Sequence, residues 1–300
     1  RRDFHLGQVY GRFRRELAGR IVDSEADAVE WLQDEYSLDE NSAQNAVTYV
    51  QHQIQVLGTI SSDRTVIAEL FTDPLGDLRL VIHSCLGARV TSPWALALAQ
   101  AFRDALGAQP EVMVNDDGIL FRFLETEGDP PLDLVRTMGP VEARERLLGE
   151  LPNSAVFGAQ FRMNAARALL LPAARGRQKR TPFWLQRLRA KDLLAAAKGF
   201  EDFPIIVETY RDCLRDVLDL AHLEEVLGSI QRHEVEVVTV ETVVPSPVAG
   251  SLLYDLIAKY MYEWDQPKAE RQIQALMVGR DLLAQLLADA SADALSLIHI

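Results

Sequence analysis

Four short strand-like runs between residues 65 and 123 interrupt a chain whose other apolar positions mostly repeat at helical spacing. Thr65–Phe71 and Leu78–His83 flank the turn-forming residues 73–77, and Glu111–Val114 and Ile119–Phe123 flank an Asn-Asp-Asp-Gly turn. Runs of this length that are joined by tight turns pair as antiparallel strands. The sequence therefore predicts an α+β fold that is mainly helical and contains a small antiparallel sheet.

Helical periodicity occupies the first quarter of the chain and most of its second half. Asn41 is a suitable N-cap for a helix that ends at Gly58, and Ser92-Pro93 favours a helix start that leads to Leu106. Later helices are expected at roughly 140–149, 154–171, 182–198, 204–219, 221–232, 247–262 and 267–288.

One strand, Val235–Val244, follows the helix pair at 204–232. This order is that of a winged-helix-like unit, although many α+β folds share it.

Turn-forming residues also suggest how the chain is divided. Gly128-Asp129-Pro130-Pro131 is the best boundary, which predicts a strand-containing module at 1–127 and a mainly helical, DNA-facing module at 128–294. Residues 295–300 read as a translation of the transposon end used to prepare sequencing libraries, so we expect them to be foreign. We interpret the rest as an internal fragment of a longer protein.

Composition limits the class of protein. The chain has 300 residues, 48% of them hydrophobic, and a formal charge of −13, which argues against a general polycation that coats nucleic acid. The sequence contains no run of 18 apolar residues and no signal peptide, so we expect no membrane partner and a cytoplasmic location. Cys85 and Cys213 are expected to be reduced thiols.

The segment from Leu151 to Lys191 carries nine basic side chains and no carboxylate, although the whole chain has 44 Asp and Glu against 31 Lys and Arg. A local excess of cations in an acidic protein indicates contact with a polyanion, because Arg and Lys release counterions from a phosphate backbone. The residues expected to bind nucleic acid are Arg175, Arg177, Lys179, Arg180, Trp184, Arg187 and Lys191.

The expected helix at 182–198 places cations beside an aromatic ring. Arg187, Lys191 and Lys198 fall within about 40° of one another around the helix axis. Trp184 lies at the edge of this stripe, where its ring could stack on a base. The alternative is that Trp184 belongs to the core and that the loop 175–180 is a solvated turn. The apolar face of the helix is expected to consist of Leu185, Leu188 and Ala196.

No catalytic, cofactor or metal site is expected. The sequence lacks a G-x-x-x-x-G-K-[ST] phosphate loop, a G-x-G-x-x-G motif and a G-x-S-x-G elbow, and its histidines form no H-x-x-x-H pair. His83 ends an apolar strand and is expected to be structural, while Asp116 and Asp117 belong to a turn. This segment therefore cannot hydrolyse ATP by itself, and any activity of its own stays open.

Several motifs occur in a fixed order from about residue 40 to 288. They are Asp63–Ile67, Gly76–Ser84, Gly87–Val90, Pro93–Leu96, Asp116–Ile119, Phe157–Arg162, Ala165–Pro172, Arg180–Trp184, Asp202–Ile205, Arg211–Asp216, Pro245–Pro247, Met261–Glu263 and Ala269–Arg271. In these motifs the chain resembles bacterial Lhr, the large helicase-related proteins.

The resemblance implies part of an ATP-dependent DNA helicase that moves 3′ to 5′ along single-stranded DNA. In that family two RecA-like motor domains and a winged helix precede a domain with a β-barrel part and helices. The chain would be most of that last domain, with an incomplete barrel.

The implied function is that of an accessory nucleic-acid-binding domain in a DNA-repair helicase, which holds single-stranded DNA or a DNA/RNA hybrid beside the motor. ATP and Mg would belong to the parent motor, and no cofactor is expected here. The alternative is a protein-interaction module that docks its basic segment on an acidic partner or on a neighbouring motor domain. A stand-alone glycosylase would need a catalytic constellation that the sequence does not offer.

Overall fold

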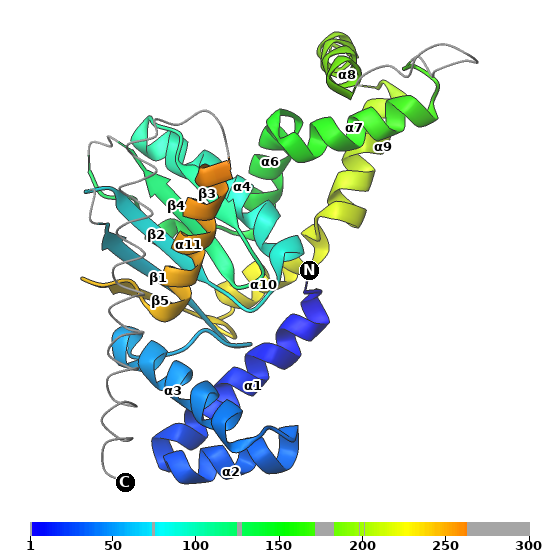
Figure 1. Cartoon of the computed structure of the whole chain (residues 1–300). Coiled ribbons are helices and arrows are strands. Elements are labelled where there is room, and N and C mark those ends of the chain that lie inside the picture. Colours follow the sequence, from blue (N-terminus) through cyan, green and yellow to red (C-terminus); the bar gives the residue numbers. More distant parts are fainter. Residues whose placement is uncertain are drawn as a thin grey trace.

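The computed structural model describes residues 2–73, 76–124, 128–171, 183–197, 199–200 and 202–262 (Figure 1). Its helices are α1 (Phe4–Asp23), α2 (Glu25–Tyr36), α3 (Glu40–Leu57), α4 (Ala88–Leu106), α5 (Asp133–Thr137), α6 (Pro140–Glu150), the 3-10 helix η1 (Leu151–Asn153), α7 (Ala155–Arg167), α8 (Phe183–Ala197), α9 (Pro204–Asp212), the π-helix η2 (Cys213–Val217), α10 (Leu220–Gln231) and α11 (Pro247–Tyr262). Its strands are β1 (Thr65–Thr72), β2 (Leu78–His83), β3 (Glu111–Val114), β4 (Gly118–Phe123) and β5 (Glu236–Glu241). The expected helix at 267–288 and residues 295–300 lie outside the described residues.

The five strands form one open sheet in the order β3-β4-β2-β1-β5. The first four strands pair antiparallel as predicted, and the α+β class is confirmed. The predicted antiparallel sheet is mixed, because the fifth strand, β5, pairs in parallel with β1. Parallel pairing requires a long crossover, which the helices between β4 and β5 supply.

The same pairing corrects the expectation of a winged-helix-like unit. Within the described residues β5 pairs only with β1, so it forms no wing beside α9 and α10. Strands from both sides of Gly128 therefore build this sheet.

Helices cover both faces of the sheet (Figure 1). Alternate residues of a strand point to opposite faces. Val66 and Leu70 of β1 belong to the large core that Trp94 and Phe102 of α4 fill from one side. Phe71 belongs to a second core on the opposite face of the sheet, where side chains of α11 pack against the strands. The result is a three-layer body that consists of α4, the sheet and α11.

Helix α4 begins at Ala88, so the expected start at Ser92-Pro93 was wrong. Proline lacks an N–H and frees the carbonyl four residues earlier. That carbonyl, on Arg89, accepts a hydrogen bond from the N–H of Asp219 (2.9 Å).

Gly87 precedes the helix without a side-chain cap of its own. Asp116 supplies the cap from the β3–β4 turn, because its Oδ1 accepts from the N–H of Ala88 (2.9 Å).

Asp116→Ala should lower the free energy of unfolding by about 1–2 kcal/mol, because the first turn of α4 loses its acceptor. The carboxylate also accepts from the backbone N–H of Arg2 (3.0 Å). Urea denaturation monitored by circular dichroism measures the change. Asp117→Ala is the matched control, since its carboxylate pairs with Arg2 at a part-exposed position. An equal loss in both variants would contradict the capping role.

Helices α1, α2 and α3 pack around a separate small core that contains Leu17, Leu32 and Val47. Helix α3 ends at Gly58 as predicted, where φ is +73°. Its N-cap is Asp39 rather than Asn41, because the Asp39 carboxylate accepts from the N–H of Ser42 (2.9 Å). An aspartate at this position satisfies the orphan N–H and also suits the helix dipole.

Helices α7, α8 and α9, which we call the arm, stand away from the sheet in Figure 1. The expected helix at 154–171 ends at Arg167, and the one at 204–219 changes to a π-helix after Asp212. Asp212 accepts hydrogen bonds from Gln160 (2.8 Å) and Asn164 (2.9 Å), which joins α7 to α9. These hydrogen bonds join two helices of the arm, and the apolar core of the arm continues into α6 through Leu147.

Candidate nucleic-acid interface

The structure describes part of the predicted binding set. Arg175, Arg177, Lys179 and Arg180 lie outside the described residues. Trp184 belongs to α8, but its side chain lies outside the described part of the structure. Arg187 and Lys191 are exposed one turn apart on α8. The structure therefore brings Arg187 and Lys191 together on one helix, and the binding roles of all seven residues stay predictions.

The described cations of the basic segment lie on two helices of the arm. They are Arg162, Arg167, Arg187, Arg189 and Lys191. Arg162 is half-buried and the other four are exposed, and in the described part of the chain none of the five forms an ion pair.

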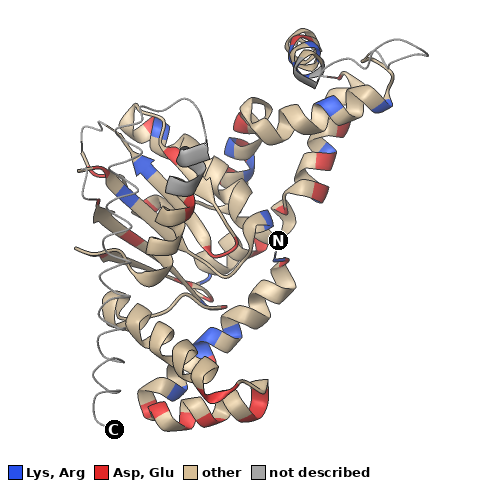
Figure 2. Cartoon of the chain, in the orientation of Figure 1, with Lys and Arg blue, Asp and Glu red and all other residues tan. Residues whose placement is uncertain are grey.

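Several arginines outside the arm form ion pairs. Arg79, Arg122 and Arg144 each pair with a carboxylate, namely Asp73, Asp77 and Glu224 in turn. Figure 2 shows the basic residues of α7 on the arm. A cation whose charge no neighbouring carboxylate offsets attracts an external anion more strongly than a paired one does.

Helix α8 packs through a different face from the one predicted. Ala190 and Ala197 are buried, and Leu194 is half-buried in the arm core, whereas Leu188 is 49% exposed and Ala196 is exposed. Contact with α7 decides which side of α8 is covered, and the weak amphipathicity of the helix could not predict it. Leu194 lies in the direction of Arg187 and Lys191 around the axis, so the cations border the contact with α7.

An acidic region lies at the opposite end of the molecule. Residues 21–63 contain nine Asp and Glu and no Lys or Arg. Figure 2 shows the carboxylates gathered along α2. The exposed ones on this helix are Glu25, Asp27, Glu30, Asp34 and Glu35. Their potential repels a phosphate backbone, so the charge distribution points any polyanion toward the arm.

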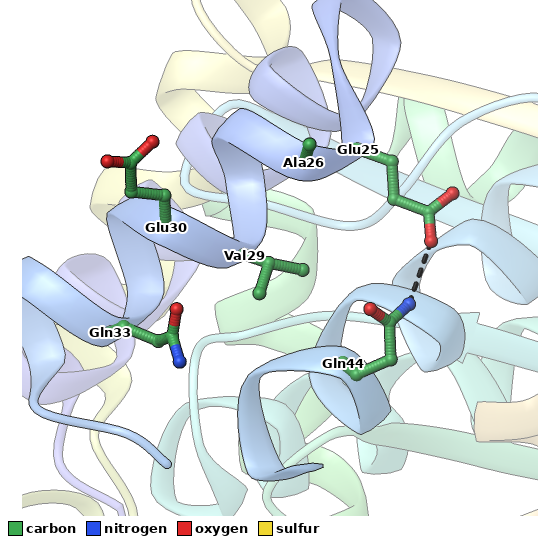
Figure 3. Close-up of a pocket in the computed structure, with 6 residues that line it drawn as sticks. All are labelled: Glu25, Ala26, Val29, Glu30, Gln33 and Gln44. Carbon is green, nitrogen blue, oxygen red and sulfur yellow. Dashed lines mark hydrogen bonds between the residues drawn. The ribbon is translucent and has the colours of Figure 1, made fainter. Parts of the chain in front are cut away.

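A hollow between α2 and α3 belongs to this acidic region (Figure 3). Glu25 and Glu30 line it above an apolar patch at Val29. The amides of Gln51 (2.9 Å) and Gln44 (2.7 Å) donate to the Glu25 carboxylate and hold its pKa below its usual range. The hollow therefore stays anionic at neutral pH and does not suit a phosphate.

Sequence reasoning missed a buried cluster around Glu69, at the centre of β1. The Glu69 carboxylate accepts from His83 Nε2 (2.7 Å), from Thr242 Oγ1 (2.9 Å) and from both the N–H (2.8 Å) and the Oγ (2.6 Å) of Ser246. Gln53 of α3 accepts from the N–H of Val248 (3.1 Å) beside it. Nothing in the local pattern of β1 marks Glu69, because its partners come from distant segments.

The Glu69 cluster joins α3, β1, β2 and the start of α11. Burial acts to raise the pKa of Glu69, but the hydrogen bonds and charge of His83 and the donors of Ser246 outweigh it and hold the pKa below its usual value. The expectation that His83 is structural agrees with its fully buried position. The cluster fixes α11 on the sheet, and Glu69, His83 and Ser246 are fully buried in it.

The described residues offer neither a metal site nor a membrane span. They contain no group of three or more His, Cys, Asp or Glu that could hold a metal ion. In the same part of the chain no helix is long and apolar enough to cross a membrane.

Known proteins match the chain in sequence and in structure. A protein family described as DEAD/H associated matches residues 60–249. The "Lhr helicase/uracil glycosylase" of Escherichia coli (strain K12) is 38% identical over 286 residues, which cover 95% of this chain and 18% of that protein. An Lhr helicase of Mycolicibacterium smegmatis is 37% identical over 95% of this chain and 19% of its own length.

A solved structure of an Lhr helicase is also similar to this chain. The structure titled "Structure of Mycobacterium smegmatis helicase Lhr bound to ssDNA and AMP-PNP" superimposes with a TM-score of 0.76 at 37% identity, and covers 84% of this chain and 31% of that one. The chain thus spans about a fifth of the length of the bacterial relatives. The chain belongs to the DEAD/H associated family, and the predicted resemblance to Lhr helicases is confirmed over nearly all of it.

Proposed function

We propose that this segment is an accessory single-stranded DNA-binding domain of an Lhr-type, ATP-dependent 3′–5′ helicase. The arm holds the tracking strand while RecA-like motor domains elsewhere in the parent protein step along it. The observation that carries the proposal is the set of exposed cations on α7 and α8 that have no carboxylate partner among the described residues. Similarity to the solved structure of an Lhr helicase bound to ssDNA supports it.

The finer assignments rest on the same proposal. Arg175, Arg177, Lys179, Arg180, Arg187 and Lys191 contact phosphates, and Trp184 stacks on a base. Within the predicted DNA-facing module at 128–294, we assign the DNA contacts to the arm. The parent protein acts in the cytoplasm, uses ATP and Mg in its motor, and binds single-stranded DNA or a DNA/RNA hybrid.

The purified chain should bind single-stranded DNA with little base preference and with strong salt dependence. If five phosphates are engaged, the logarithm of the affinity should fall with the logarithm of salt concentration at a slope of roughly −3.5. Fluorescence anisotropy with a labelled oligonucleotide measures this slope. A slope near zero would contradict phosphate binding and would favour docking of the basic segment on an acidic protein surface.

A further inference from the structure

Phe200 is the most exposed Phe, Tyr or Trp residue whose exposure the structure describes. The residue is 69% exposed, and it lies in the short connection between α8 and α9. A phenyl ring has no polar atom that would gain from contact with water. An exposed ring on an arm that also carries unpaired cations therefore suggests an aromatic contact with a ligand.

The backbone around Phe200 holds the ring outward. The N–H of Phe200 donates to the carbonyl of Ala197 (2.9 Å), and the N–H of Phe203 donates to the carbonyl of Phe200 (3.1 Å). Ala197 and Phe203 both belong to the apolar core of the arm. Ala197 and Phe203 thus anchor the turn, and the Phe200 side chain is left exposed to solvent.

The same turn lies near cations of both helices. Ala197 and Phe203 pack in one core with Ala165 of α7, two residues from the exposed Arg167. Lys191 precedes Ala197 on α8 by roughly 9 Å of helix. The Phe200 ring and these cations therefore belong to the same arm.

We propose that Phe200 stacks on a base of the single-stranded DNA whose phosphates the arm binds, which rests on the function proposed above. Cations hold the backbone of a single strand, and an aromatic face beside them accepts any base with little sequence preference. The site is thus a stacking platform for one nucleobase at the junction of α8 and α9.

The test compares Phe200→Ala with the wild-type chain by anisotropy, using an ordinary oligonucleotide and one with abasic sites. On the ordinary strand Phe200→Ala should bind roughly 5- to 150-fold more weakly, while the salt slope stays unchanged. On the abasic strand the two proteins should bind alike. Phe200→Tyr should keep the affinity, and Phe200→Leu should lose it as alanine does.

Val207→Ala is the matched control, because Val207 is an apolar side chain of the same arm with 46% exposure and no ring. It should leave affinity unchanged. If wild-type chain binds with the expected slope and Phe200→Ala binds equally well, stacking is wrong but the proposed function survives. If Phe200→Leu binds like wild type, or the loss is equal on the abasic strand, the ring contacts protein rather than a base. If the wild-type chain binds no DNA, the proposed function itself fails.

Discussion

Replacing Glu69 by alanine should lower the free energy of unfolding by about 3–5 kcal/mol, because the donors around it would remain buried without an acceptor. His83 and Ser246 are fully buried and reach Glu69 from β2 and from the start of α11. Chemical denaturation at neutral pH measures the loss. Glu241→Ala is the control on the same sheet, since that side chain is exposed on β5, and it should change stability by less than about 0.5 kcal/mol.

The effect of Glu69→Ala should depend on pH in one direction. The folded state holds the Glu69 pKa below the value of about 4.3 that the unfolded chain has. The carboxylate therefore stabilises the fold fully above that unfolded value, and this contribution is lost as pH falls through the folded pKa. The difference between wild type and Glu69→Ala should shrink as pH falls below about 4.3, where the carboxylate of the unfolded chain becomes protonated. A difference that grows on acidification would contradict an ionised Glu69.

Reversing three charges in the basic segment should abolish DNA binding. The variant carries Arg177→Glu, Arg180→Glu and Arg187→Glu, which replaces three attractive phosphate contacts with repulsive ones. At low salt the affinity should fall by at least about 1000-fold, because each contact contributes to counterion release and each new carboxylate adds repulsion. Anisotropy with a single-stranded oligonucleotide measures the loss.

A matched control separates the position of the charges from the net charge. Arg12, Arg64 and Arg136 are exposed and lie outside the arm, so their replacement by glutamate changes the net charge by the same amount. This control should keep most of the affinity. Equal losses in the two triple variants would show that overall charge, and not the basic segment, governs binding.

Local signals in the sequence predicted much of the fold. The strands β1 to β4 and most helices follow from periodicity and turn residues, which act over a few neighbours. The parallel pairing of β5 with β1 could not be predicted this way, because it depends on a crossover of more than one hundred residues. The start of α4 was missed for the same reason, since its cap comes from Asp116 on a distant turn.

The candidate site was likewise predictable only where its features depend on neighbouring residues in the sequence. A carboxylate-free segment is visible in the sequence, and its described cations are indeed without ion pairs in the described part of the structure. The packed face of α8 depended on α7 and was predicted wrongly. Phe200 and Phe203 look equivalent in sequence, yet the turn between them places one ring outside and the other in the core.

The salt dependence of DNA affinity in a neutralised variant tests most directly whether the basic segment grips the phosphate backbone. The variant Arg177→Gln, Arg180→Gln, Arg187→Gln removes three contacts without adding repulsion. Its slope should be shallower than that of the wild type by about two units, whereas the same change at Arg12, Arg64 and Arg136 should leave the slope near −3.5. Identical slopes in the two variants would contradict the assignment of the phosphate contacts to this segment.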